Sequence, residues 1–253
     1  MRGPTFPLRV QNVFDASSNV KVFLLARPDG QPLPAYAPGA HIRVETRPHG
    51  GARVSRSYSL IDHVDGVPAI YRIAVRLDKH GGGGSLFMHR EVDIGSVLEV
   101  SPPSNDFEMD SGSRPRLFVA GGIGITPIMA MAYRAAGRAE PFQLHYVARS
   151  PEVMPFRAEL LIEFGDRVVL YFDEGLSGHA LPLADLLASH AERGPVYVCG
   201  PTAMIDEALL LAEQIGYAAG GLHVERFSEP APRPSGDPPV MSMRRQSGLT
   251  LTP

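Results

Sequence analysis

The chain has 253 residues, of which 44% are hydrophobic, and a formal net charge of -3 at pH 7. This size and composition favour one large or two ordinary folded domains, and the charge argues against a general nucleic-acid-binding protein. No apolar run is long enough to cross a membrane, and the N-terminal residues MRGPTFPLRV lack the apolar stretch of a signal peptide. The single cysteine, Cys199, excludes an internal disulfide and an iron–sulfur cluster held by this chain. We predict a monomeric cytoplasmic protein that binds neither membrane nor nucleic acid.

The first half of the chain is predicted to form short strands separated by turns. Alternating apolar and polar residues indicate half-buried antiparallel strands, and glycine and proline mark the turns between them. The predicted strands cover residues 8–14, 20–28, 41–46, 58–63, 69–77 and 96–103. Many short strands at near-regular spacing favour a small barrel or sandwich.

After Arg114 the pattern changes, because apolar strands now alternate with helical stretches. The predicted strand–helix pairs cover 117–122 and 127–137, 142–149 and 156–164, 167–175 and 181–192, and 195–200 and 202–216, before a last strand at 221–227. This alternation is typical of a doubly wound parallel sheet. We therefore predict an antiparallel β-barrel in residues 1–112, an α/β domain in 113–228 and a proline-rich linker in 229–239.

Residues 117–131 combine a buried strand, a glycine-rich turn and the start of a helix. Thr126 is predicted as the helix N-cap and Pro127 as the first helical residue. Backbone N–H groups at such a helix start can bind a pyrophosphate, and the glycines of the turn would let a ligand approach the backbone closely. The glycine spacing departs from the complete dinucleotide fingerprint, so an ordinary strand–helix turn remains the alternative.

Two segments of the first half have the chemistry of an anion site. In Arg56-Ser57-Tyr58-Ser59, the guanidinium can grip a phosphate and the tyrosine ring can cover a planar heterocycle. Strand alternation places the arginine and tyrosine on one face and the two serines on the other. The four glycines at 81–84 precede a helix-like stretch and offer backbone N–H groups to an anion. The competing interpretations are a solvated arginine beside a packed tyrosine, and a plain hairpin loop.

A third segment, Cys199-Gly200-Pro201, follows a predicted strand of the second half. It would lie at the carboxyl edge of the sheet, where ligands bind in open α/β folds. A buried thiol there is compatible with simple packing, because cysteine is among the most buried residue types.

These segments, together with Pro38-Gly39-Ala40-His41 and Gly83-Gly84-Ser85, resemble in order and spacing the signatures of the ferredoxin–NADP reductase superfamily. The resemblance spans about residues 6 to 228. Within the superfamily the chain is most similar to the phthalate dioxygenase reductase branch, through the GGIGITPIMAMA helix, the FDEG after a strand and the ending HVERF.

The resemblance implies a flavin-dependent NAD(P)H reductase. The barrel would bind the flavin, which in this branch is FMN, and the α/β domain would bind the nicotinamide nucleotide, mostly NADH. Electrons would pass to an iron–sulfur partner, a plant-type ferredoxin domain that serves an oxygenase or demethylase. FAD and NADPH are the alternatives for the two cofactors.

The resemblance also assigns roles to individual residues. Arg56 would hold the FMN phosphate, Tyr58 would lie against the isoalloxazine ring, and Ser59 would hydrogen-bond near the reactive edge of the ring. Thr126 and Cys199 would flank the nicotinamide. The residues implied to act in catalysis are Ser59, Thr126, Cys199 and Phe227. The implied cofactor contacts are Arg56, Ser57, Tyr58, Ser59, Ala74, Arg76, Gly83, Gly84, Ser85, Gly121, Gly122, Gly124, Thr126, Pro127, Arg149, Asp173, Cys199, Gly200, Pro201 and Phe227.

The chain departs from the branch at two places. Gly82 stands where the branch often has arginine, so Arg76 is a candidate replacement for that phosphate contact. Residues 240–253 resemble the first hairpin of a plant-type ferredoxin domain, yet no cysteine follows. This predicts either a fragment or a chain that has lost its ferredoxin domain. Two other functions remain open, an FAD-type reductase feeding haem or a separate ferredoxin, and a nucleotide-binding module without turnover.

Overall fold

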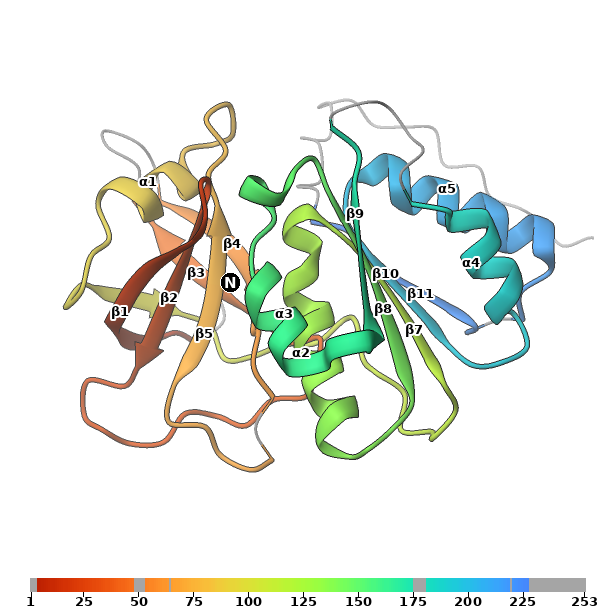
Figure 1. Ribbon diagram of the computed structural model, residues 1–253. Helices are drawn as coiled ribbons and strands as arrows, with labels where there is room; N and C mark the ends of the chain where they lie inside the picture. The colour runs from red at the N-terminus through yellow and green to blue at the C-terminus, as the bar shows by residue number, and fades with distance from the viewer. Residues whose placement is uncertain (1–3, 48–52, 64, 175–180, 219, 228–253) are drawn as a thin grey trace, which may run out of the picture.

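The computed structural model describes residues 4–47, 53–63, 65–174, 181–218 and 220–227. The predicted linker and hairpin, at 229–239 and 240–253, lie outside these residues. The described chain forms two sheets that stand side by side, with helices between them and on the far side (Figure 1).

The first sheet contains six antiparallel strands of the described chain, in the order β4-β3-β6-β1-β2-β5. It curls around a buried apolar core that includes Leu8, Phe23, Ile42 and Tyr71. The Ile61 N–H donates to the Arg72 carbonyl at 3.0 Å, which brings the chain after β4 alongside β5, at the opposite end of the sheet order. The strands are β1 (Phe6–Ser17), β2 (Val20–Ala26), β3 (His41–Thr46), β4 (Val54–Ser59), β5 (Tyr71–Arg76) and β6 (Val97–Val100), and α1 (Gly84–Arg90) follows β5.

The strand predicted at 58–63 was placed too late, because β4 ends at Ser59. Leu60 and Ile61 are both fully buried, although they are consecutive. Leu60 packs in the core of the first sheet, whereas Ile61 packs in a second core beside the helices. Because both residues are apolar and buried, the sequence at this point resembles a continuing strand.

The Pro38-Gly39 signature has a packing reason. Gly39 has a φ of 92°, in the region that favours glycine. A Cβ atom on Gly39 would lie 2.0 Å from the carbonyl oxygen of Phe107. The Asn105 side-chain amide donates to the Pro38 carbonyl at 2.9 Å. This turn therefore locks β3 to the segment that follows β6.

The second sheet is parallel, with five described strands in the order β11-β10-β7-β8-β9. Helices cover both of its faces (Figure 1), so the predicted doubly wound α/β fold is confirmed. The strands are β7 (Arg116–Gly121), β8 (Phe142–Ala148), β9 (Val168–Phe172), β10 (Val196–Cys199) and β11 (Leu222–Glu225). The helices are α2 (Ile125–Gly137), α3 (Arg157–Phe164), α4 (Leu183–His190) and α5 (Thr202–Ile215), with short 3₁₀ turns η1 (Gly122–Gly124), η2 (Pro151–Val153) and η3 (Gly165–Arg167).

Strand β7 shows why its sequence is continuously apolar. Phe118 and Ala120 belong to the core that contains α2, whereas Leu117 and Val119 belong to the core that contains α4 and α5. A strand covered on both faces needs apolar residues at every position.

The core around α2 also joins the two halves of the molecule. It contains Val22, Ile61 and Ala74 from the first sheet together with Ile125 and Met129 from α2. Helices α2 and α3 lie between the two sheets in Figure 1. Continuous apolar packing across a junction favours a fixed arrangement of two domains over free relative motion.

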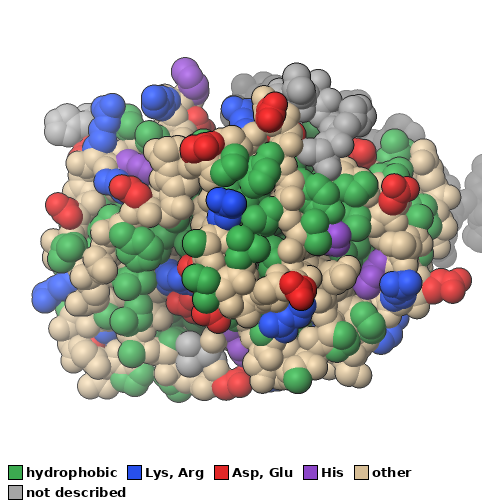
Figure 2. Space-filling model, viewed as in Figure 1, with side chains coloured by type: hydrophobic (Ala, Val, Ile, Leu, Met, Phe, Trp, Pro, Cys, Tyr) green, Lys and Arg blue, Asp and Glu red, His purple; other side chains and the backbone are tan. Residues whose placement is uncertain are grey.

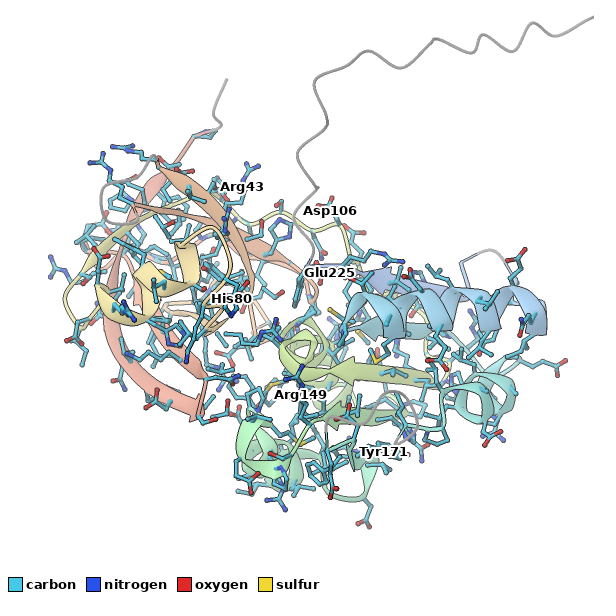
Figure 3. All side chains as sticks on the ribbon, turned by 90° about the horizontal axis from the view of Figure 1, so that it is seen from above. Arg43, His80, Asp106, Arg149, Tyr171 and Glu225 are labelled. Atoms are coloured by element: carbon cyan, nitrogen blue, oxygen red, sulfur yellow. The ribbon has the colours of Figure 1, made fainter. Side chains whose placement is uncertain are left out.

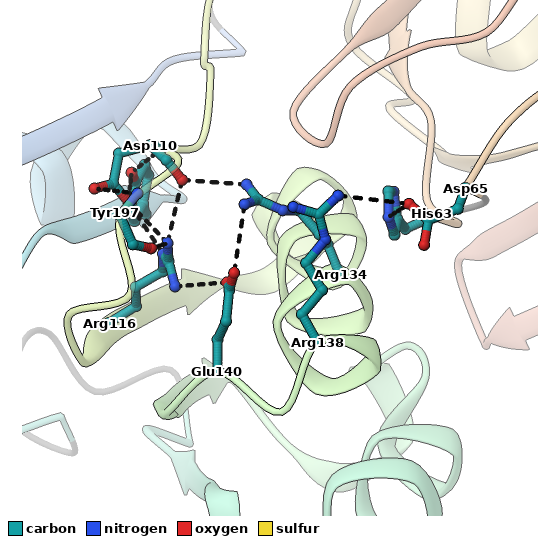
Figure 4. Close-up of polar contacts among 9 residues, drawn as sticks. His63, Asp65, Asp110, Arg116, Arg134, Arg138, Glu140 and Tyr197 are labelled. Carbon is teal, nitrogen blue, oxygen red and sulfur yellow. Dashed lines mark hydrogen bonds and ion pairs between the residues drawn. The ribbon is translucent and has the colours of Figure 1, made fainter.

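A polar network extends along the same junction (Figure 4). The Arg116 side chain is fully buried and pairs with Asp110 at 3.0 Å and with Glu140 at 2.8 Å. Arg138, at the end of α2, lies 3.6 Å from Asp65 of the first half. The connection near residue 110, predicted as a loop between domains, is therefore held in place by Arg116.

The distribution of surface charge and the length of the helices are relevant to the predicted absence of nucleic-acid and membrane binding. Acidic and basic side chains are mixed over the face shown in Figure 2. None of the helices in the described part of the chain is long and apolar enough to cross a membrane.

Candidate functional site

A cleft of about 400 Å³ lies where the first sheet meets the start of α2. Its walls come from β4, β5, the glycine-rich loop before α1, the η1–α2 turn and the end of the chain after β11. The lining residues are Arg56, Ser57, Tyr58, Ser59, Ala74, Arg76, Asp78, Gly81, Gly82, Gly84, Ser85, Ile123, Thr126 and Phe227. The cleft thus unites residues that the sequence places in both halves.

Strand β4 contributes four consecutive residues, 56–59, to the cleft. Strand alternation alone would give the cleft only two of them. All four border it because β4 stands at one end of the sheet order, so its outer edge is available as well as its faces. Ser59 is only 4% exposed, and its hydroxyl has no hydrogen-bond partner within the described chain. A buried hydroxyl without a partner is costly, so its position in a cleft indicates a ligand contact.

Arg56 lies against the glycine-rich loop. A Cβ atom on Gly82 would come within 2.5 Å of Arg56 Nη2, and one on Gly84 within 2.7 Å of Arg56 Cγ. Gly83 precedes α1 with a φ of 83°. Since any larger residue would displace the arginine, the loop composition keeps a guanidinium and several backbone amides at one end of the cleft, an arrangement suited to a phosphate.

The Ser85 hydroxyl closes this loop. It accepts from the Asp78 N–H at 3.0 Å and donates to the Asp78 carbonyl at 3.2 Å. Ser85 therefore shapes the glycine-rich loop through its side chain. Gly81 and Gly82, of the loop predicted to offer backbone N–H groups to an anion, also line the cleft, as does Asp78, which was not predicted.

The start of α2 differs from the prediction. The helix begins at Ile125, directly after η1, so Thr126 is not the N-cap and Pro127 is not the first helical residue. The Thr126 hydroxyl instead donates to the Ile123 carbonyl at 3.0 Å. The 3₁₀ turn leads straight into the helix, and a separate capping side chain is not needed. Thr126 and Ile123 nevertheless both face the cleft.

The glycines of the η1 turn serve packing within the protein. A Cβ atom on Gly124 would lie 2.3 Å from the Cys199 carbonyl oxygen, and one on Gly121 would lie 2.6 Å from Pro201 Cδ. The turn after β7 and the turn after β10 therefore touch through their backbones. This close contact gives a packing reason for glycine at both positions, and the predicted role of Gly121 and Gly124 in ligand binding stays a prediction. Around Gly122 there is open space.

Cys199 and Glu225 lie side by side at the ends of β10 and β11. Cys199 is fully buried, and burial together with the Glu225 charge raises the pKa of its thiol. The thiol is therefore neutral near pH 7, which argues against a nucleophile.

Glu225 is a polar residue that the sequence analysis missed. Its Oε2 atom is buried and has no partner within the described residues. Burial, with a smaller effect of Asp106, raises the pKa of Glu225 to about 7. Asp106 and Glu225 lie close together at the junction of the two halves in Figure 3. The available signal was a carboxylate in the last strand of the parallel sheet, within HVERF.

Replacing Glu225 with glutamine is expected to make the protein more stable at pH 8 but not at pH 5. Because the pKa of Glu225 is higher in the folded state than the usual 4.5, the parent loses stability as the pH rises from about 4.5 to about 7, by at most about 3 kcal/mol. Urea unfolding of both proteins at pH 5 and pH 8 measures the difference. Equal free-energy differences at the two pH values would contradict the shifted pKa.

The remaining predicted residues lie at different distances from the cleft. Phe227, 45% exposed, forms part of its wall. Arg149 and Asp173 follow β8 and β9, outside the residues that line the cleft. Figure 3 shows Arg149 at the junction of the two halves.

In the same turn after β8, the Ser150 hydroxyl donates to Glu152 at 2.5 Å. Pro127, Cys199, Gly200 and Pro201 adjoin the η1 turn at the carboxyl edge of the parallel sheet.

The chain is similar in sequence to known reductase subunits of oxygenase and demethylase systems. The chain is 37% identical over 223 residues to the carnitine monooxygenase reductase subunit of Escherichia coli K12, covering 88% of this chain and 68% of the relative. It is 36% identical to the phthalate 4,5-dioxygenase oxygenase reductase subunit of Pseudomonas putida, covering 90% and 69%. It is 38% identical to the vanillate O-demethylase oxidoreductase of a Pseudomonas strain, covering 87% and 68%. No family model matches the chain.

Solved structures lead to the same group. Phthalate dioxygenase reductase, described as a modular structure for electron transfer from pyridine nucleotides to [2Fe-2S], matches with a TM-score of 0.79 and 31% identity, over 91% of this chain and 70% of that one. An intact self-sufficient cytochrome P450 monooxygenase matches with a TM-score of 0.80 and 31% identity, over 93% of this chain and 31% of that one. The chain thus spans about two thirds of the reductases and about a third of the P450 protein. Fold, identity and coverage agree that the chain belongs to the phthalate dioxygenase reductase-like branch of the ferredoxin–NADP reductase superfamily.

Proposed function

We propose that the protein is the reductase component of an oxygenase or demethylase system, taking electrons from NADH through a flavin to an iron–sulfur partner. The observation that carries this proposal is the cleft at the junction, where the unpartnered Ser59 hydroxyl, the Arg56 guanidinium and the start of α2 meet. The relatives named as reductase subunits of monooxygenase and dioxygenase systems support the class of partner.

The residues of the cleft fit FMN. The volume of about 400 Å³ lies in the range of small-molecule sites. Arg56 and the amides of the glycine-rich loop would hold the phosphate, with Arg76 nearby in the cleft wall. The Tyr58 ring would lie against the isoalloxazine, and Ser59 would hydrogen-bond its polar edge. We assign residues 1–112 to flavin binding and 113–228 to nucleotide binding on this basis.

Bound flavin would accept hydride from the nicotinamide and pass electrons on one at a time. The protein would contribute positioning and exclusion of water. Thr126 stands in the cleft wall on the side of the parallel sheet, Cys199 and Glu225 lie at the ends of β10 and β11, and Phe227 follows β11. In this assignment Phe227, which is half exposed, covers the space where the nicotinamide would stack.

The proposal is tested by the colour of the purified protein. A yellow protein that is bleached by NADH without oxygen supports a flavin reductase, whereas a colourless protein that binds NADH supports a module without turnover. Mass spectrometry of the released flavin distinguishes FMN from FAD. Release of FAD would exclude the FMN assignment and leave the reductase class unchanged.

The protein is expected to prefer NADH over NADPH by at least about tenfold in kcat/KM, or about 1.4 kcal/mol. Glu152 accepts a hydrogen bond from the Ser150 hydroxyl. This hydrogen bond lowers the pKa of the Glu152 carboxyl, which therefore remains charged near neutral pH. Like charge would repel a 2′-phosphate near the end of β8, although Arg149 lies in the same turn. Steady-state kinetics with both nucleotides measures the ratio, and Glu152→Gln should reduce it. Higher kcat/KM with NADPH would overturn this specificity.

A further inference from the structure

A second charged cluster joins the two halves of the molecule away from the cleft. Arg72 Nη2 lies 2.7 Å from Asp62 Oδ1 and 2.8 Å from Glu159 Oε1. The Tyr133 hydroxyl donates to the same Glu159 oxygen at 2.5 Å. Asp62 and Arg72 belong to the first half, Tyr133 to α2 and Glu159 to α3. The Arg72 side chain at the centre of this clamp of four side chains is only 13% exposed, whereas Asp62 and Glu159 are about one third exposed.

The clamp residues continue the elements that form the cleft wall. Asp62 follows Ser59 by three positions, Arg72 shares a strand face with Ala74 and Arg76, and Tyr133 lies two turns after Thr126 in α2. The rise per residue puts Arg72 and Ala74 about 7 Å apart along β5, and Thr126 and Tyr133 about 10 Å apart along α2. The clamp therefore joins three elements of the cleft wall at points about 10 Å or less from the cleft residues that they carry.

Phe156 adds a strained residue beneath the clamp. It has a φ of 62°, in the left-handed region that a bulky residue rarely adopts, and it immediately precedes α3. Its ring is buried in the core shared by the two halves, with the Arg72 guanidinium 5.7 Å from the ring centroid. Local strain persists only where the surroundings over-determine it. The clamp and the shared core together fix how α3 meets the first sheet.

We propose that Arg72 is a positioning residue for hydride transfer: by clamping β5 to α2 and α3, it sets the distance between the flavin-facing wall and Thr126. This rests on the proposed reductase function. A partly exposed ion cluster of this kind is a weak source of stability, because desolvation of Arg72 and solvent screening of the carboxylates offset much of the attraction. Reaction rates, in contrast, respond to small displacements of the reacting groups, and a displacement of about 1 Å can lower a rate about 100-fold.

The first test is the rate at which NADH reduces the flavin, measured by stopped-flow absorbance. Arg72→Met keeps the aliphatic stem and removes the clamp, whereas the control Arg27→Met removes an ion pair with Asp29 that lies within the first sheet. Arg72→Met is expected to lower the limiting rate about 10- to 100-fold with little change in the half-saturating NADH concentration. Tyr133→Phe, which removes one hydroxyl, should give a smaller effect in the same direction. An unchanged limiting rate in Arg72→Met, with flavin bound, overturns the proposal.

The second test is independent of activity and uses flavin-free protein. Spin labels at Phe14→Cys in β1 and Leu210→Cys in α5 report the distance between the two halves, since both positions are exposed and Cys199 is fully buried. The parent and Arg27→Met should give one narrow distance distribution, and Arg72→Met a broader or shifted one. Identical distributions would overturn the clamp. A parent protein that takes up no flavin would instead disprove the reductase function, while the distances still decide whether Arg72 holds the halves together.

Discussion

The 253-residue chain is expected to reduce ferricyanide with NADH and to give no oxygenase turnover without an added iron–sulfur protein. Ferricyanide needs only a reduced flavin, which the proposed site at the junction would supply. A plant-type cluster needs four cysteine thiolates, and this chain contains only Cys199, which is buried. Visible spectra should therefore show flavin bands with no iron–sulfur shoulder. Oxygen consumption and product formation with the cognate oxygenase measure the turnover.

The control for this result is the same assay with a separate plant-type ferredoxin domain. Electron flow should return if the docking surface lies on the two described domains. NADH-driven turnover by the chain alone would contradict the need for an iron–sulfur intermediary.

Replacing Arg56 with alanine is expected to weaken flavin binding about 10- to 150-fold. Loss of a charge-assisted hydrogen bond costs about 1.5–3 kcal/mol, and each 1.4 kcal/mol corresponds to a factor of ten in affinity. Arg56 borders the cleft and lies against Gly82 and Gly84, so its loss removes a guanidinium from the glycine-rich end of the cleft. Fluorescence titration of flavin-free protein with FMN measures the dissociation constant.

Two variants make this result interpretable. Arg43→Ala removes an exposed arginine from the paired strand β3, opposite Ser57, and should leave flavin binding unchanged. Arg56→Lys keeps the charge but loses the two-pronged geometry, so its affinity should lie between those of the parent and the alanine variant. Arg56→Ala protein that purifies with a full complement of FMN would show that the phosphate is held elsewhere.

Much of the fold follows from local sequence patterns. Continuous apolar strands alternating with helical stretches predict the parallel sheet, because strands covered on both faces need apolar residues throughout. The resemblance of short motifs also selects most of the cleft, including Arg56, Ala74, Arg76 and Thr126. The structure brings these residues together in one cleft, and their contacts with the cofactors stay a prediction.

The sequence indicates where strands and helices lie, but the contacts between them became clear only from the folded structure. Periodicity shows which face of a strand is buried, but not what buries it. Leu60 and Ile61 pack in two different cores, and their sequence was therefore predicted as part of a strand. For the same reason, the sequence did not reveal that Gly124 packs against the Cys199 carbonyl. Glu225 meets Cys199 only when β11 pairs with β10, and Arg72 meets Glu159 only when the two halves of the molecule pack. Their burial, charge and geometry arise from that packing, which no local pattern encodes.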